Sequence, residues 1–197
     1  MKKRTLSLIV QSTAAILPLT FSGAAVVAQT HQLIVLTDFG QTPTDGWNAD
    51  NVDSPLVFDK ACNLYGVTFL GGPSNAGTVS ELTKKPDGLW ARKTLHRFTG
   101  GSDGANPGSP LVLDAAVLCG AIEVAGGVGE THEFQGYGVV FELSPRSDGT
   151  WAETVLHNFL GYPDGKYSLN GVIFDSAGNL YGTTSGGGAH GVEPSSN

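Results

Sequence analysis

Short sequence segments recur 61 residues apart along the chain, and this internal repetition constrains the fold more than any other feature. The matching pairs are Glu81-Leu82 and Glu142-Leu143, Trp90 and Trp151, His96 and His157, Asp103-Gly104 and Asp164-Gly165, and Asp114 and Asp175. A first copy fits with shifted spacing, through Phe39 with Phe98 and Phe159, Asp45 with Asp103 and Asp164, and Asp59 with Asp114 and Asp175. Such a period indicates similar structural units that bury their apolar surfaces against one another.

Each unit contains four segments typical of β-strands, and no segment has a sustained helical period. In the second copy these segments are residues 110–114, 117–122, 138–143 and 151–159. Side chains alternate between the two faces of a strand. The residues that we expect on one face of the last strand are Trp151, Glu153, Val155, His157 and Phe159.

Aspartate-glycine pairs separate the third and fourth strands of a unit, at Asp87-Gly88 and Asp148-Gly149, and favour tight hairpins. Four antiparallel strands in a unit of this length are the plan of a propeller blade. We therefore predict an all-β fold whose antiparallel four-stranded repeat units stack as a partial β-propeller. The predicted units are residues 34–94, 95–155 and 156–197, the last of them incomplete.

The predicted strands are too few for a closed ring. They comprise one lone strand near Gln32–Phe39, four strands in each of two units and two strands in the third. A closed propeller needs at least ~4 blades. Blade faces and strand edges therefore stay open, which predicts an open arc that self-associates, an aggregation-prone fragment or a truncated gene product.

Residues 1–28 have the three parts of a secretory signal peptide. Met1-Lys2-Lys3-Arg4 is positively charged, the stretch from Leu6 to Leu19 is mostly apolar, and small residues precede a cleavage point between Ala28 and Gln29. An uncleaved membrane anchor is the alternative, but Pro18 and several polar residues interrupt the apolar stretch. We therefore predict an exported protein, secreted or on the cell surface, with no membrane span in the β-repeat region, residues 29–197.

The chain is acidic, with a formal net charge of −7, and removal of the leader would take away three basic residues. Nucleic acid is excluded as a partner because phosphate binding requires a basic surface, and an anionic membrane surface is disfavoured for the same reason. An oxidising compartment would allow Cys62 and Cys119 to pair. They occupy non-equivalent repeat positions, however, and two free, buried thiols are the favoured interpretation.

The third copy contains four of the recurring motifs: Leu156-His157-Asn158-Phe159, Asp164-Gly165, Asp175-Ser176-Ala177-Gly178-Asn179-Leu180-Tyr181-Gly182-Thr183-Thr184 and Gly186-Gly187-Gly188. The second copy contains a fifth, Gly138-Val139-Val140-Phe141-Glu142-Leu143-Ser144-Pro145. With these motifs the chain after the leader resembles the GloVer-type tandem repeat of exported bacterial proteins. The resemblance implies a propeller-like repeat fold and no established reaction. The second copy departs from the pattern, with Val117-Leu118-Cys119-Gly120 for Asn-Leu-Tyr-Gly and Ala121-Ile122 for Thr-Thr.

An oxygen-rich cluster lies in the longer loop of the first copy and consists of Asp45, Asn48, Asp50, Asn51 and Asp53. Ca²⁺ takes about six to eight oxygen ligands, so Asp45, Asp50 and Asp53 are candidate metal ligands. Their spacing matches no familiar Ca²⁺ loop, and Asp and Asn are also ordinary turn residues. Turn formation is therefore the favoured explanation, and no other cofactor is predicted.

Three further residues are candidates for ligand binding. Asp103 and Asp164, each followed by glycine like Asp45, would place carboxylates on one rim of the stacked units, although holding a turn is the favoured role. Trp47 offers a stacking surface for a sugar ring. Trp90 and Trp151 begin the same strand in successive units, so packing between units explains them better.

Catalytic motifs are weak. Residues 100–104 match the spacing of a hydrolase nucleophile elbow around Ser102, but that motif requires a helix after the turn and none is predicted. The same repeat position holds Thr44 in the first copy and Pro163 in the third. His96 and His157 share one strand position, which is more typical of a packed or edge residue than of a catalytic base.

These observations predict an exported, non-enzymatic repeat protein that acts as a structural or interaction module of unknown ligand. One alternative is a secreted carbohydrate-binding or glycan-processing propeller, in which Trp47 and the Asp-Gly loops would meet on one face. Another is a truncated remnant without independent function. The partner suggested by the open blade edges is a second copy of the chain.

Overall fold

The computed structural model describes residues 10–15, 28–33, 35–37, 46–47, 55–122, 136–168 and 170–189. The chain divides into two compact parts, residues 1–38 and residues 39–197. Regular structure in the described residues consists of strands alone, with no helix. The prediction of an all-β fold is confirmed.

The first part contains one antiparallel hairpin. It pairs β1 (Val10–Ala15) with β2 (Ala28–Leu33), and Ala28 stands opposite Ala15. The predicted leader thus supplies β1 and the first residue of β2. The lone strand that we expected near Gln32–Phe39 lies earlier in the chain, because pairing with β1 ends at Leu33 and residues 35–37 are outside any strand.

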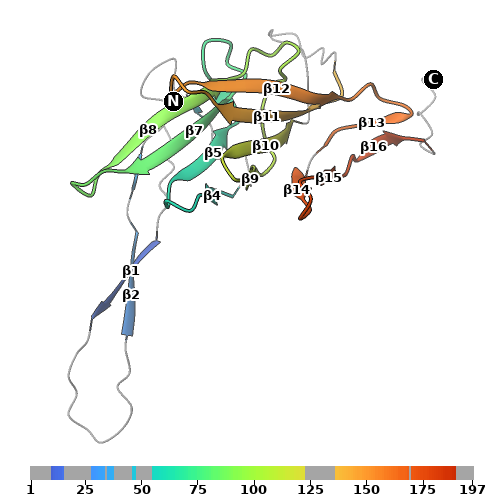
Figure 1. Ribbon diagram of the computed structural model, residues 1–197. Helices are drawn as coiled ribbons and strands as arrows, with labels where there is room; N and C mark the ends of the chain where they lie inside the picture. The colour runs from blue at the N-terminus through green and yellow to red at the C-terminus, as the bar shows by residue number, and fades with distance from the viewer. Residues whose placement is uncertain are drawn as a thin grey trace, which may run out of the picture. The chain divides into compact units, whose positions relative to one another are not determined.

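Two four-stranded antiparallel sheets form the centre of the second part (Figure 1). The first sheet has the order β4 (Val57–Phe58), β5 (Leu64–Thr68), β7 (Thr78–Lys84) and β8 (Trp90–Arg97). The second has the order β9 (Val112–Asp114), β10 (Val117–Ile122), β11 (Val139–Pro145) and β12 (Trp151–Asn158). The predicted four-stranded antiparallel units are therefore confirmed.

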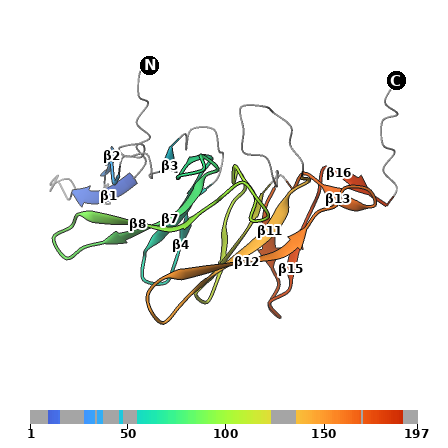
Figure 2. The same cartoon turned by 90° about the horizontal axis from the view of Figure 1, so that it is seen from above.

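The third unit supplies a two-stranded sheet and a separate ribbon. The sheet pairs β14 (Val172–Phe174) with β15 (Leu180–Gly182), which correspond to the first two strands of the other units. The ribbon pairs β13 (Asp164–Lys166) with β16 (Gly186–Gly188) and lies beyond the end of β11 and β12 (Figure 2). The first unit has an equivalent ribbon of β3 (Gly46–Trp47) and β6 (Leu70–Gly71). Neither ribbon was predicted.

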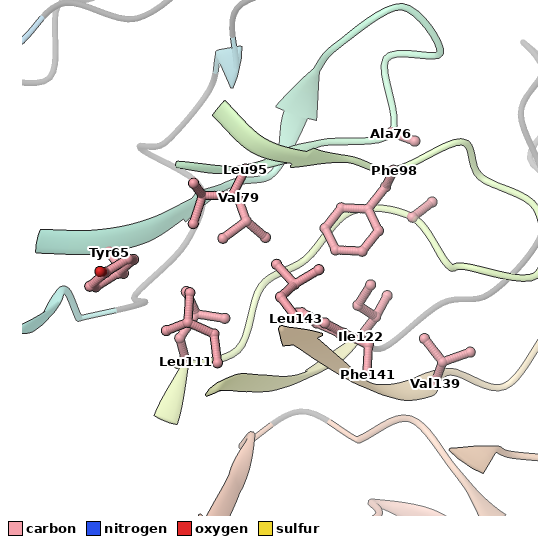
Figure 3. Close-up of a cluster of buried hydrophobic side chains, with 12 residues drawn as sticks. Tyr65, Ala76, Val79, Leu95, Phe98, Leu111, Ile122, Val139, Phe141 and Leu143 are labelled. Atoms are coloured by element: carbon pink, nitrogen blue, oxygen red, sulfur yellow. The ribbon is translucent and has the colours of Figure 1, made fainter. Parts of the chain in front are cut away.

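The main core fills the space between the two four-stranded sheets, which we call the first seam. Phe98, Ile122, Phe141 and Leu143 point toward one another there (Figure 3). The rings of Phe98 and Phe141 meet edge to face with centroids 5.3 Å apart. A methyl group at Gly120 would lie 2.7 Å from the Phe141 ring, so this strand position must stay glycine for the ring to fit.

A smaller apolar cluster fills the second seam, between the second sheet and the third unit. It contains Cys119, Ala121 and Val172, with Val140 and Leu180 packed against it. The strand β10 is therefore buried on both faces, with Leu118 and Ile122 in the first seam and Cys119 and Ala121 in the second. This double burial fits the sequence of the second copy, in which Cys119 and Ile122 stand where both other copies have Tyr and Thr.

A β-bulge occurs at the same position in both four-stranded sheets, between Val79 and Ser80 and between Val140 and Phe141. Directly paired residues share a face of a sheet. Val155 pairs with Phe141, whereas His157 pairs with Val140, which belongs to the second seam. The expectation that His157 shares a face with Trp151, Glu153 and Val155 is therefore wrong, because the bulge inserts one residue and reverses the alternation.

The two cysteines are free thiols. Cys119 is buried in the second seam, as predicted. The expected burial of Cys62 is wrong, because Cys62 lies in the exposed turn between β4 and β5, where its amide donates a hydrogen bond to the Asp59 carbonyl oxygen.

An aspartate fastens the turn between the first two strands of the first unit. Asp59 Oδ1 accepts hydrogen bonds from the amides of Ala61 and Asn63, and Oδ2 accepts them from Asn63 Nδ2 and the Tyr65 hydroxyl. Partial burial raises the pKa of Asp59, but the hydrogen bonds from Asn63 and Tyr65 outweigh it and lower the pKa overall.

The third unit repeats this arrangement. Asp175 accepts hydrogen bonds from Ala177, Asn179 and Tyr181, and those from Asn179 contribute most to lowering its pKa to about 2. The second unit has Val117 and Cys119 at the Asn and Tyr positions, so Asp114 lacks both side-chain donors.

The turn aspartates therefore provide a matched pair of variants. Asp59→Ala should lower the free energy of unfolding by about 1–2 kcal/mol, because two backbone amides and the Asn63 side chain lose their charged acceptor, while the Tyr65 hydroxyl keeps Glu81. Asp114→Ala should change it by less than about 0.5 kcal/mol. Urea denaturation of both variants measures the difference, and equal effects would contradict the proposed role of the hydrogen-bonded turn.

Candidate functional site

A histidine and an aspartate come together at the same repeat position in two units. His96 Nε2 lies 3.6 Å from Asp103 Oδ2, and His157 Nε2 lies 3.0 Å from Asp164 Oδ2. The first distance is that of an ion pair, whereas the second allows a hydrogen bond. The bulge described above turns both histidines toward the following loop, where the aspartates lie.

Each of these aspartates also holds its own loop. Asp103 accepts hydrogen bonds from the Thr99 amide at 2.8 Å and from Thr99 Oγ1 at 2.5 Å. Asp164 accepts one from the Leu160 amide at 2.9 Å. The structure therefore places Asp103 in the loop that follows β8 and Asp164 at the start of β13, where each fixes the preceding loop and orients an imidazole.

The two pairs differ in their surroundings. His96 and Asp103 are mostly enclosed in the first seam, whereas His157 and Asp164 are largely exposed. Each imidazole meets the edge of a phenylalanine ring, with centroids 4.6 Å apart for His96 and Phe98. Burial lowers the pKa of His96, although the charge of Asp103 acts in the opposite direction.

A third titratable group lies in the first seam. Glu153 on β12 pairs with Leu143 and so faces the first sheet. Burial, and then the negative charge of Asp103, raise the pKa of Glu153 to about 7. Among the described residues, Glu153 Oε1 and His96 Nε2 are the buried side-chain atoms without a hydrogen-bond partner. The first seam thus contains a carboxyl group that is half protonated near neutral pH.

The chemistry of the His–Asp pairs is that of an oriented imidazole. Catalysis by such a pair would need a nucleophile or a substrate proton within reach of the imidazole. Ser102 adjoins Asp103, but it lies exposed in a turn that the Gly104 amide closes onto the Gly101 carbonyl oxygen. Strands follow this turn as far as residue 122, whereas a nucleophile elbow requires a helix.

An aromatic cluster lies at the outer end of the second seam. Tyr137 and Tyr167 meet with ring centroids 6.3 Å apart. The Lys166 ammonium group lies 5.8 Å from the centroid of Tyr137 and 5.7 Å from that of Tyr167. We did not predict this cluster from the sequence. A comparison of the repeat copies could have revealed it. At the offset of 61 residues, Tyr137 and Lys166 are large side chains at positions where the preceding copy has Ala76 and Ala105.

Comparison with known families identifies the repeat. The family model described as the Gloeobacter/Verrucomicrobia repeat matches residues 23–192. The chain belongs to the Gloeobacter/Verrucomicrobia repeat family. No curated protein and no solved structure matches it. The resemblance to a GloVer-type repeat is therefore confirmed.

Several candidate residues of this Gloeobacter/Verrucomicrobia repeat chain lie outside the described residues. They are Asp45, Asn48, Asp50, Asn51 and Asp53, the predicted oxygen-rich loop. Within the part of the chain that is described, no group of three or more His, Cys, Asp or Glu residues is arranged to hold a metal ion. The Ca²⁺ interpretation of the loop stays a prediction.

Trp47, the candidate for sugar stacking, is described only through its backbone. It pairs with Leu70 in the β3–β6 ribbon. The other two tryptophans lie at the start of β8 and β12, and Trp151 packs on the first-seam core with its ring centroid 6.3 Å from that of Tyr65. A search of the described residues for helices long and apolar enough to cross a membrane finds none.

The raised pKa of Glu153 predicts a specific dependence of stability on pH. The carboxyl pKa is about 7 in the folded chain and 4.5 for the group in its ordinary state. Glu153 therefore holds more proton in the folded state between these values, so its contribution to the free energy of unfolding falls as pH rises from about 4.5 to about 7. Glu153→Gln keeps the neutral form at every pH and should be more stable than the wild type at about pH 8, by on the order of 1–3 kcal/mol.

Urea denaturation from about pH 4.5 to about pH 8 tests this effect. Glu142→Gln is the matched control, because it alters a carboxyl group on the opposite face of the same sheet. The control should keep the wild-type loss of stability across this range. A Glu153→Gln profile parallel to that of the wild type would show that the carboxyl group is not held neutral in the seam.

Proposed function

We propose that this member of the Gloeobacter/Verrucomicrobia repeat family is an exported, non-enzymatic interaction module whose third unit stacks against a further unit of the same repeat. Export is supported by the basic, apolar and small-residue segments of residues 1–28, and the location proposed is secreted or cell-surface. The observation that carries the proposal is the exposed outer face of the third unit.

That face presents residues whose repeat equivalents are covered in the other units. Ile173 is 66% exposed and Tyr181 is 55% exposed. Their equivalents in the second unit, Val112 and Cys119, pack in the second seam, and Cys119 is 1% exposed. The equivalents in the first unit, Val57 and Tyr65, pack in the first seam. The third unit therefore presents the surface that its neighbours use for stacking.

A strand edge accompanies this face. In the complete units the second strand has a partner on each side, as β5 does between β4 and β7. Within the described residues 170–189, β15 pairs with β14 alone. An edge with free amide and carbonyl groups accepts an added strand. Apolar face and open edge together fit one more repeat unit in a propeller-like stack.

A second copy of the chain is the partner that we propose to supply this unit. The seams on either side of the second sheet show that this repeat stacks on its own kind. The net charge of −7 makes two copies repel at long range, so salt should strengthen their association by screening that repulsion.

Sedimentation velocity over a concentration series tests this proposal. We expect reversible self-association that is stronger at higher salt. Ile173→Glu should weaken it by about tenfold or more, because a carboxylate would have to be buried against the apolar face. Leu89→Glu is the matched control, since Leu89 is similarly exposed at 64% but lies at the β7–β8 hairpin. A chain that stays monomeric at high salt, or equal effects of the two variants, would refute stacking between copies.

A further inference from the structure

Three exposed tyrosines gather around one loop at the end of the second seam. Tyr137 precedes β11, Tyr162 lies in the loop before β13, and Tyr167 follows β13. The loop is closed by two hydrogen bonds between Gly161 and Gly165, and the Tyr162 hydroxyl contacts the Ala189 carbonyl oxygen at 3.5 Å. These three residues form the tyrosine cluster, which shares no residue with the outer face of the third unit.

The equivalent positions at the first seam hold smaller residues than the tyrosine cluster does. There the Asn106 amide donates to the Ala76 carbonyl oxygen at 2.7 Å, and here the Tyr167 amide donates to the Tyr137 carbonyl oxygen at 2.8 Å. The backbone is therefore the same in both units. The side chain at the first position changes from Ala76, which is 1% exposed, to Tyr137, which is 38% exposed.

The backbone of the loop is shaped to receive the Tyr137 ring. A methyl group added at Gly161 would lie 2.9 Å from Tyr137 Cε2, so the ring rests directly on the glycine backbone. Tyr167 stands at an angle of 65° to this ring, and Lys166 lies against both rings. The rings are thus held in fixed positions and are not loose surface side chains.

Tyr167 adopts a left-handed backbone conformation, with φ of 60°. The equivalent Asn106 has φ of 58°, and asparagine is one of the few residues that tolerate this region. A tyrosine there strains the backbone. An asparagine would suit this backbone better, so the contacts of the Tyr167 ring with Tyr137 and Lys166 set this position apart from its equivalent in the first seam.

Polar groups border the cluster. Asp164 opens β13, two residues before Lys166, and holds His157 at 3.0 Å. Both members of this pair are exposed, in contrast to His96 and Asp103 in the first seam. An exposed imidazole and carboxylate therefore accompany the exposed phenol rings in the segments on either side of this loop.

We propose that the tyrosine cluster binds a neutral saccharide. Aromatic faces pack against the C–H face of a sugar ring, while phenol, imidazole and carboxylate groups hydrogen-bond its hydroxyls. A polyanion is disfavoured because Asp164 borders the cluster and the whole chain carries a net charge of −7. The site is distinct from Trp47, the tryptophan that we predicted from the sequence to stack on a sugar.

Affinity electrophoresis in gels that contain soluble polysaccharides tests this site with the full chain. The neutral probes are laminarin, xyloglucan and galactomannan, and the acidic probes are alginate and polygalacturonate. We expect at least one neutral probe to retard the wild type. Tyr162→Ala and Tyr137→Ala should each weaken that binding by about tenfold, because each removes a stacking ring.

Two controls keep folding and stacking separate from saccharide binding. Leu89→Ala removes an exposed apolar side chain far along the sequence and should bind as the wild type does. Ile173→Glu, which disrupts stacking between copies, should also keep the saccharide affinity. Tyr162→Ala is the decisive variant because Tyr162 is exposed in a loop, and its urea midpoint must match that of the wild type.

Three outcomes would overturn the proposal. They are no retardation by any neutral probe, retardation by the acidic probes alone, and binding that neither tyrosine variant weakens. A wild-type chain that binds the saccharide but stays monomeric at high salt would overturn the proposed stacking function and leave this site standing.

Discussion

Coverage of sheet faces by neighbouring units is the constraint on which the repeat region depends. A sheet with apolar residues on both faces is stable only where both faces are packed. The second unit meets this condition, because Leu118 and Phe141 fill the first seam while Cys119 and Val140 fill the second. The His–Asp pairs work within this arrangement because they hold the segments that lead from one unit to the next, whereas the hydrogen-bonded turns join the first two strands of a single unit.

Local signals in the sequence were sufficient for most strands. The second unit was predicted to within about two residues at each strand end, because alternating side chains and Asp-Gly turns act over short distances. The Asp-Gly hairpins form as expected, with the Gly88 amide bonded to the Lys85 carbonyl oxygen. The β3–β6 and β13–β16 ribbons were missed because they join short, glycine-rich segments that carry no apolar pattern.

The candidate site was predicted in part. His96, Asp103, His157 and Asp164 were recognised as repeated positions, but their pairing depends on a β-bulge that no glycine or proline announces. The altered pKa of Glu153 depends on burial in a seam, which is a property of two units together and not of one strand. The sequence shows the tyrosine cluster only as a difference between copies, because Tyr137 and Lys166 stand where the preceding copy has alanine.

The differences between copies follow a physical division of roles. Residues that fix the backbone keep their type, as Asp59 and Asp175 do at the first turn. Residues in a seam vary, as from Tyr65 to Cys119, because the neighbouring unit decides what fits there. A unit can therefore change its seam without disturbing its own strands.

Stacking on the outer face of the third unit would cover Ile173 and Tyr181, whereas the tyrosine cluster belongs to the seam before that unit. A partner unit and a saccharide would thus occupy different sides of the third unit, so the two proposed interactions are compatible in one molecule.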